Sequence, residues 1–291
     1  MRKIFEETKG LTVTKNFPLS KISSIGIGGK IKYFLKIKDK NSLLVLRKFL
    51  KKEKYIFVGK LTNILFSDGY LDGVIIQYQD KSFEYIDENP PKIRVGAGIS
   101  LNNLILMLPK FSLSGLEPLV GIPGSLGGAL KMNAGAFGVT IADFLEEMEI
   151  FSLKEGFKTI RKKEINFNYR FSSIKEDELI VSAVLILEKK GRPDLIQKYL
   201  KMRNKKFPKG KSLGCIFKNP EGFSAGKLIE DVGLKNFRVN DAIVSEKHAN
   251  FILNLGTARF LDVYELIQII KERVYERFNI LLTEEIKIVD F

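Results

Sequence analysis

The glycine-rich segment from Gly115 to Gly138 holds the clearest chemical potential in this sequence. Four of its glycines are closely spaced: Gly121, Gly124, Gly127 and Gly128. Without a Cβ atom, a glycine lets the main chain approach a ligand closely. Consecutive free N–H groups in such a stretch form a concave site for phosphate oxygens. Tight turns and close packing require the same glycines, so the spacing alone leaves a phosphate site and a packing role both open.

The sequence does not match three other familiar kinds of binding or catalytic motif. Gly26-Ile27-Gly28-Gly29 begins like a dinucleotide fingerprint, but Ile31 stands where G-x-G-x-x-G requires glycine. No segment fits G-x-x-x-x-G-K-[ST]. The single His248 and the single Cys215 give neither a zinc-ligand set nor a Cys–His pair close in sequence, so no metal site is predicted. We interpret His248 as a structural residue.

Seven short segments, in this order along the chain, have counterparts in one known family. They are SSIGIGG (23–29), GIPGSLGGALKMNAGAFG (121–138), NYRFS (168–172), GCIFKNP (214–220), SAGKLIEDVGLKNFRV (224–239), VSEKHANFILN (244–254) and TEEIKIV (283–289). By these motifs, which cover nearly the whole chain, the sequence resembles the UDP-N-acetylenolpyruvoylglucosamine reductases. It resembles the shorter form of that family.

The resemblance implies a fold and an activity. The fold would be α+β: an FAD-binding fold of the vanillyl-alcohol-oxidase (PCMH) type in two subdomains, followed by a C-terminal α/β substrate-binding domain. The expected bounds are 1–78 and 79–190, with FAD held between them, and 191–291 for the UDP-sugar. The family activity passes hydride from NADPH to FAD and then to the enolpyruvyl group of the UDP-sugar, in peptidoglycan precursor synthesis. The flavin is expected to be noncovalent, because no histidine or cysteine lies in the glycine-rich segment or near Gly59.

The same resemblance implies roles for individual residues. Arg170 matches the arginine that contacts the substrate carboxylate, and Glu285, rather than its neighbour Glu284, matches the glutamate that polarises the same site. Cys215 stands where most members have the serine that protonates the α-carbon. The substrate-binding candidates are Tyr169, Arg203, Lys206, Lys218 and Asn219. The cofactor-binding candidates are Gly59, Lys60, Thr62, Asn63, Gly121, Ile122, Pro123, Gly124, Ser125, Gly127, Gly128, Asn133, Ala134 and Gly135.

One loop departs from the family pattern. The family has G-G-G-S-N after its second strand, where it binds the flavin diphosphate, and this chain has Gly59-Lys60-Leu61-Thr62-Asn63. Because two glycines are missing, we do not expect the tight backbone conformation to survive unchanged. Lys60 offers a positive charge in their place. The affinity for FAD, more than the fold, is expected to depend on this loop.

The elements that must position these residues follow an α/β pattern with short connections. Strands are predicted at 33–37, 55–58, 73–77, 92–95, 147–153 and 179–187. Helices are predicted at 41–54, after an N-cap at Ser100, from Pro193, and at 258–278, the last with one apolar stripe.

Charge and composition limit the partners. Residues 1–60 hold 16 Lys and Arg against 4 Asp and Glu, and the other 231 residues are nearly balanced at 32 against 30. The excess alternates with apolar residues in Lys30–Lys38, which is typical of a strand with one wet face, so we predict a solvated surface and no nucleic-acid partner. No uncharged segment reaches the roughly 18 residues of a spanning helix. One cysteine forms no intrachain disulfide. We expect a cytoplasmic monomer without a membrane partner.

Two other readings stay open. One is another flavin oxidoreductase of the same fold that acts on an alcohol or amine, against which the C-terminal motifs stand. The altered loop and the basic N-terminal part would also suit a flavin-free protein that binds nucleotide sugars or nucleic acid.

Overall fold

The computed structural model describes residues 9–50 and 53–290. The chain divides into two compact units. The first contains Met1–Lys15, Tyr33–Lys60 and Gly73–Met202, and the second contains Asn16–Lys32, Leu61–Asp72 and Arg203–Phe291. This division differs from three consecutive modules, because two N-terminal segments belong with the C-terminal residues. The ligand assigned to each module stays a prediction.

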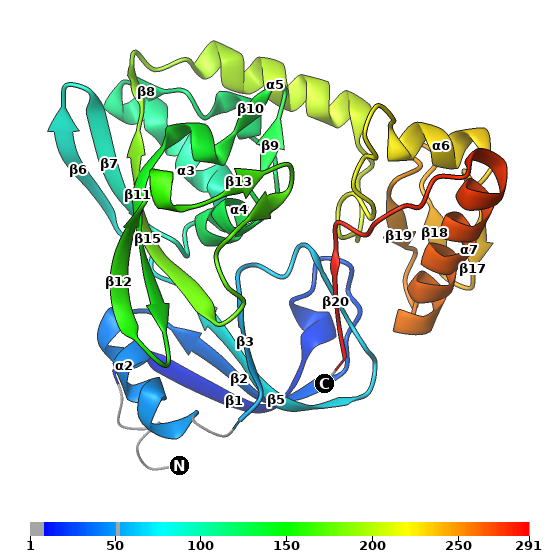
Figure 1. The fold of residues 1–291 in the computed structure, drawn as a ribbon, viewed down its shortest axis with the longest axis horizontal. Helices are drawn as coiled ribbons and strands as arrows, with labels where there is room; N and C mark the ends of the chain where they lie inside the picture. The colour runs from blue at the N-terminus through cyan, green and yellow to red at the C-terminus, as the bar shows by residue number, and fades with distance from the viewer. Residues whose placement is uncertain (1–8, 51–52, 291) are drawn as a thin grey trace. The chain divides into compact units, whose positions relative to one another are not determined.

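A five-stranded antiparallel sheet forms the centre of the first unit (Figure 1). Its order is β12 (Gly156–Arg161), β11 (Leu145–Ser152), β15 (Glu178–Ile186), β7 (Pro91–Gly96) and β6 (Phe83–Glu88). The central strand β15 is almost wholly buried, because apolar residues point to both faces.

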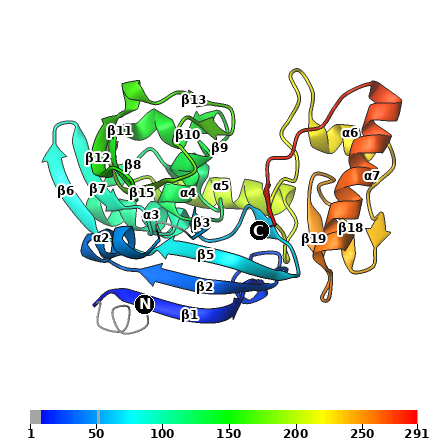
Figure 2. The ribbon, with the colours of Figure 1, turned by 60° about the horizontal axis from the view of Figure 1, so that its bottom comes forward.

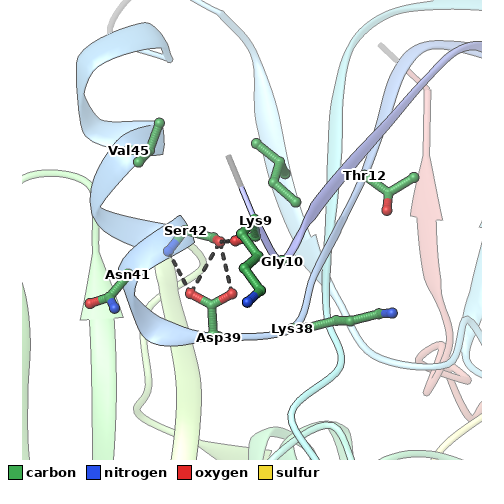
Figure 3. Close-up of a pocket in the computed structure, with 9 residues that line it drawn as sticks. Lys9, Gly10, Thr12, Lys38, Asp39, Asn41, Ser42 and Val45 are labelled. Atoms are coloured by element: carbon green, nitrogen blue, oxygen red, sulfur yellow. Dashed lines mark hydrogen bonds between the residues drawn. The ribbon is translucent and has the colours of Figure 1, made fainter. Parts of the chain in front are cut away.

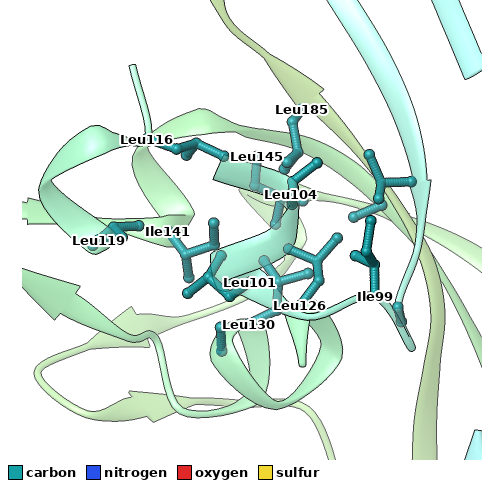
Figure 4. Packing of buried hydrophobic residues seen from close by; sticks show 14 of the residues in the cluster. Ile99, Leu101, Leu104, Leu116, Leu119, Leu126, Leu130, Ile141, Leu145 and Leu185 are labelled. Carbon is teal, nitrogen blue, oxygen red and sulfur yellow. The ribbon is translucent and has the colours of Figure 1, made fainter. Parts of the chain in front are cut away.

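One face of this sheet packs against α3 (Leu101–Met107) and α4 (Leu126–Lys131). The cluster contains Leu101 and Leu104 of α3, Leu126 and Leu130 of α4, and Leu185 of the sheet (Figure 4). These side chains are fully buried, so α4 and the glycines around it have a fixed place on the sheet.

The opposite face packs against α2 (Lys40–Phe49). Phe151 and Val181 of the sheet pack in a second cluster with Leu43 of α2. Their sequence neighbours Ile150 and Ile180 point to the other face and belong to the first cluster. The Asp39 carboxylate caps α2 by accepting the Ser42 N–H at 2.9 Å. The helix ends at Phe49, earlier than the predicted Lys54. Residues 51 and 52 of the predicted helix lie outside the described residues.

A second sheet accompanies α2, and its strands lie side by side in Figure 2. Its order is β1 (Leu11–Pro18), β2 (Lys30–Ile37), β5 (Tyr70–Tyr78) and β3 (Tyr55–Val58). β3 runs parallel to β5, and Val58 lies opposite Gln77.

The second unit packs α7 (Phe260–Phe278) and α6 (Ala225–Asp231) with short strands. One sheet has the order β17 (Arg238–Val239), β18 (Ala242–Val244), β19 (Ile252–Asn254), and β4 (Ile64–Phe66) pairs in parallel with β20 (Lys287–Val289). The predicted apolar stripe of α7 is confirmed, since five members are buried and the sixth, Phe278, is partly buried against the same core; the five are Val263, Leu266, Ile267, Ile270 and Val274.

The remaining helix is α5 (Pro193–Lys206). The remaining strands have two residues each: β8 (Leu113–Ser114), β9 (Gly135–Ala136), β10 (Val139–Thr140), β13 (Phe167–Asn168), β14 (Phe171–Ser172) and β16 (Glu188–Lys189). No helix among residues 9–50 and 53–290 combines the length and the apolar composition that crossing a bilayer requires.

Candidate active site

The Gly59–Asn63 loop keeps a left-handed residue without the family's glycines. Leu61 has φ +56°, a region that L-residues rarely occupy, and its side chain is only 2% exposed. A leucine therefore adopts the left-handed conformation here without a glycine, and the effect of the missing glycines on FAD affinity stays a prediction. Gly59 itself lies against the glycine-rich segment, because a Cβ atom there would stand 2.6 Å from Ser125 Oγ.

The glycine-rich segment uses most of its N–H groups inside the protein. Gly127 N–H donates to the Ala97 carbonyl at 2.9 Å, and Gly128 N–H donates to Ser125 Oγ at 3.2 Å. Gly121 N–H donates to Asn102 Oδ1 at 3.0 Å. The N–H groups of these three glycines are therefore not free, which disfavours a phosphate site formed by them. At Gly127 the packing role applies, since a Cβ atom would lie 3.0 Å from Ala97 Cβ.

A cavity of about 90 Å³ lies between this segment and the Gly59 loop, within the first unit. Its wall includes Gly59, Ser125, Gly128 and Lys131. Tyr78 also lines it, and burial, together with the Asp80 carboxylate, raises the pKa of Tyr78 far above its ordinary value. Two segments predicted to bind the cofactor thus share one cavity.

Two observations on the first unit fit a nucleotide cofactor at this place. The wall includes three glycines, and at Gly59 a side chain would collide with Ser125. Further along the segment, Asn133 Oδ1 is buried and accepts no hydrogen bond from the described residues. A buried acceptor without a hydrogen bond lowers the stability of the folded protein, and a hydrogen-bond donor on a ligand would remove this cost.

A different, larger hollow of about 690 Å³ lies at the start of α2 (Figure 3). It contains none of the predicted site residues. Its Ser42 hydroxyl donates to the Lys9 carbonyl at 3.1 Å and to the Asp39 carboxylate at 3.0 Å. These polar groups cap the helix, so the hollow has a structural explanation.

Arg170 lies in the two-residue turn between β13 and β14. Its φ is +54°, its Nη2 donates to the Gly135 carbonyl at 3.0 Å, and its guanidinium lies 5.2 Å from the ring centre of Tyr169. Asn133 Nδ2 donates to the Asn168 carbonyl at 3.0 Å, so the turn is attached to the glycine-rich segment. A non-glycine residue in this conformation is a form of strain that is concentrated at functional sites.

The Cys215 and Glu285 segments run side by side in the second unit. Glu285 N–H donates to the Ile216 carbonyl at 2.7 Å, and Lys218 N–H donates to the Thr283 carbonyl at 2.9 Å. Asn63 Nδ2 donates to the Glu285 carbonyl at 3.0 Å. Residues from three distant parts of the sequence therefore meet here.

Glu284 and Glu285 differ in their surroundings. The Glu284 carboxylate forms an ion pair with Lys271 of α7 at 2.8 Å. Asn219, another candidate from the Cys215 segment, accepts the Ala225 N–H at 3.0 Å and so supports the start of α6.

Arg203 and Lys206 lie at the C-terminal end of α5, where both cations face the ring of Phe207 at 4.9 and 5.7 Å. The His248 ring lies 5.3 Å from the same ring, and the His248 Nδ1 is buried. Burial first, and then the charge of Lys206, lower the pKa of His248. The lowered pKa favours the neutral imidazole within this aromatic cluster, and the structural role of His248 stays a prediction.

Comparisons with known proteins agree with this arrangement. Residues 33–157 match the family described as FAD binding domain, and residues 205–289 match the C-terminal domain of UDP-N-acetylenolpyruvoylglucosamine reductase. The reductase of that name from Thermotoga sp. (strain RQ2) is 39% identical over 99% of this chain and 98% of its own length. This chain belongs to the UDP-N-acetylenolpyruvoylglucosamine reductase family.

Other members give the same result. The reductase from Aquifex aeolicus (strain VF5) is 36% identical over 95% of both chains. The crystal structure of the family's enzyme (MurB) from Thermus caldophilus is 32% identical, with a TM-score of 0.84 over 96% of this chain and all of that one. The fold is thus the α+β flavoprotein fold that the motifs predicted.

Within this reductase fold, the predicted residues form two groups. The first unit holds Gly59, Lys60, the segment from Gly121 to Gly135, Tyr169 and Arg170. The second unit holds Thr62, Asn63, Arg203, Lys206, Cys215, Lys218, Asn219 and Glu285. Sequence reasoning missed Gln77, whose Nε2 donates to the Gly59 carbonyl at 2.6 Å. A glutamine in the otherwise apolar run Gly73–Tyr78 was the available signal.

Proposed function

We propose that this chain reduces the enolpyruvyl ether of a UDP-linked amino sugar to the lactyl ether, with NADPH as the reductant and FAD as the hydride carrier. The observation that carries the proposal is the side-by-side course of the Cys215 and Glu285 segments, fixed by the 2.7 Å bond between Glu285 N–H and the Ile216 carbonyl. That backbone pairing, in a member of the reductase family, supports a shared role for Cys215 and Glu285.

The chemical problem lies in the substrate. FAD, when bound, supplies hydride to the β-carbon of the enolpyruvyl group. Negative charge then grows on the α-carbon and its carboxylate, and it must be stabilised by a preorganised cation and a proton donor.

Arg170 is proposed to bind the substrate carboxylate. A guanidinium matches a carboxylate with two parallel N–H bonds. The side chain is already oriented, since Nη2 donates to the Gly135 carbonyl and the plane lies near Tyr169. A cation fixed before the reaction needs little reorganisation as charge develops.

Cys215 is proposed to protonate the α-carbon. An ordinary thiol has a pKa of about 8.5, so it is mostly protonated at neutral pH and is a stronger acid than a serine hydroxyl. Glu285 is proposed to polarise the same site. The Lys271 partner of Glu284 supports this choice between the two neighbouring glutamates, because it already neutralises Glu284.

The remaining candidates are proposed to hold the ends of the ligands. Tyr169 and Asn219 would contact the sugar nucleotide, while Arg203, Lys206 and Lys218 would neutralise its phosphates. The cofactor candidates from Gly59 to Asn63 and from Gly121 to Gly135 would hold FAD without a covalent bond. We further propose a monomer that works in the cytoplasm, where NADPH and UDP-sugars are available.

A flavin spectrum tests the function directly. The purified protein should be yellow, should bleach under NADPH in the absence of oxygen, and should regain its colour when the enolpyruvyl UDP-sugar is added. Bleaching of the oxidised flavin by simple alcohols or amines, which donate hydride to the flavin, would favour another oxidoreductase of this fold. A colourless protein that takes up no FAD on titration would remove the enzyme hypothesis.

A further inference from the structure

The segment 215–218, which begins with Cys215, has residues 283–285 along one side. Phe217 lies opposite Glu284 in a short antiparallel pairing. The two backbone hydrogen bonds of this pairing come from the residue before Phe217 and the residue after it. The N–H and the carbonyl of Phe217 itself are therefore available to a partner on the other side of the segment.

That partner is the side chain of Asn250. Its Oδ1 accepts the Phe217 N–H at 2.9 Å, and its Nδ2 donates to the Phe217 carbonyl at 2.8 Å. One amide thus forms both of the hydrogen bonds that a residue of a neighbouring antiparallel strand would form. Asn250 is 2% exposed and Phe217 is 1% exposed, so water does not compete for these bonds.

A turn explains why a side chain, and not a strand, takes this place. Cys215 lies opposite Phe251 in a second antiparallel pairing. The backbone turns just before Phe251, whose N–H donates to the His248 carbonyl at 3.0 Å. The main chain therefore leaves the pairing before it reaches Phe217, and the Asn250 side chain continues the pairing for one residue.

These contacts fix the course of the segment that carries the thiol. Without the Asn250 amide, two buried peptide groups of Phe217 would lack partners, and a shift of the segment would relieve that cost. A misplacement of about 1 Å at a reacting group can slow a reaction about a hundredfold. We propose that Asn250 is a positioning residue, which holds Phe217 so that the Cys215 thiol keeps its place beside the Glu285 segment. This rests on the proposed function for the roles of Cys215 and Glu285.

The first experiment follows the two half-reactions by stopped flow on the full chain with bound FAD. Asn250→Leu keeps the approximate shape of the side chain and removes both hydrogen bonds. It should slow reoxidation of the reduced flavin by saturating enolpyruvyl UDP-sugar at least about tenfold, and it should leave reduction by NADPH within about twofold of the parental rate.

Asn254→Leu is the matched control. Asn254 is also buried, and its side chain also bonds to backbone groups, namely the Ile25 carbonyl and the N–H groups of Gly256 and Ala258. Both leucine variants should lower the midpoint of thermal unfolding, since both leave buried backbone groups without partners. Only Asn250→Leu should slow the reoxidation.

The second experiment measures the position of the thiol without turnover. Cys215 is the single cysteine of the chain, so its alkylation by iodoacetamide is read directly by mass spectrometry. The rate should change at least about threefold in Asn250→Leu and stay close to the parental rate in Asn254→Leu, because the reactivity of a thiol depends on its surroundings.

Asn250→Asp provides a rescue, and it keeps the inference testable if Asn250→Leu does not fold. A protonated carboxyl has nearly the shape of the amide and can likewise accept one hydrogen bond and donate another. Burial favours this neutral form. Reoxidation in Asn250→Asp should therefore approach the rate of the parent at the same pH as the pH is lowered from about 8 to about 6.

Three results would overturn the inference. They are parental rates of reoxidation and alkylation in the Asn250 variants, equal slowing of the two half-reactions, and a loss of reoxidation in Asn254→Leu as large as that in Asn250→Leu. Failure of the proposed function is a different result. A parent that bleaches under NADPH and regains its colour with the enolpyruvyl UDP-sugar keeps the function, whatever these variants do.

Discussion

Leu61 offers a test of the loop conformation through stability alone. Truncating a buried leucine to alanine costs about 2–5 kcal/mol, and Leu61 is 2% exposed. The next step, from alanine to glycine, normally costs about 1 kcal/mol in lost backbone entropy and about 0.8 kcal/mol for the buried methyl group. At φ +56° it also removes a left-handed strain of about 1–2 kcal/mol. The two effects nearly cancel, so Leu61→Ala and Leu61→Gly should be equally destabilised.

The control is Leu43, which is fully buried in the helix α2. There the alanine-to-glycine step relieves no strain and should cost about 1–2 kcal/mol. Urea unfolding of all four variants, followed by circular dichroism, gives the free energy of unfolding for each. If the alanine-to-glycine step costs the same at both positions, residue 61 is not left-handed in the folded protein and the reasoning fails.

Other predictions concern catalysis and pH. Cys215→Ala should accept hydride from NADPH but fail to turn over substrate, whereas Cys215→Ser should keep substantial activity; turnover by the alanine variant at the parental rate would assign the proton to another group. In stopped-flow traces, Arg170→Ala and Glu285→Gln should slow reoxidation of the reduced flavin by substrate by about a hundredfold or more and leave its reduction by NADPH nearly unchanged. The control Glu284→Gln should match the parent in both half-reactions. Equal slowing of the two half-reactions in Arg170→Ala or Glu285→Gln would indicate a structural role. Folding lowers the pKa of His248 from its ordinary value of 6.5, so between the two pKa values the folded state binds fewer protons than the unfolded state. The free energy of unfolding should therefore fall as the pH drops below 6.5. Thermal unfolding of His248→Phe against pH should show a flatter dependence, and an unchanged slope would point to other groups.

The sequence predicted best the elements with a strong apolar pattern. The strand Tyr55–Val58 has the predicted bounds, and α7 begins two residues after the predicted Ala258. The missed strands β6 and β12 lie at the two edges of their sheet, and most of their side chains are exposed. An edge strand of this kind carries too little alternation to be distinguished from a loop.

Sequence motifs identified the candidate residues, but they did not predict which groups these residues would hydrogen-bond. The N–H of Gly127 is used by the Ala97 carbonyl, which lies thirty residues earlier in the chain at the end of β7, and no local pattern gives that pairing. Gln77 was missed for the same reason, since its partner Gly59 becomes a neighbour only through the register of β3 and β5.

The parallel pairing of β4 with β20 also has a consequence for synthesis on the ribosome. Residues 61–72 belong with a unit whose other strand, Lys287–Val289, is made more than two hundred residues later. At about 5–20 residues per second, that interval is roughly 10–40 s. Until residues 203–291 are made in the last part of this interval, Ile25, Ile27 and Leu65 have none of the partners from those residues that they contact in the core of the second unit. Most of the first unit is meanwhile available to fold, so the nascent chain must carry two apolar segments through that time. Chaperones that recognise short apolar stretches would have their binding sites at these N-terminal residues, and release would coincide with the arrival of the last strand.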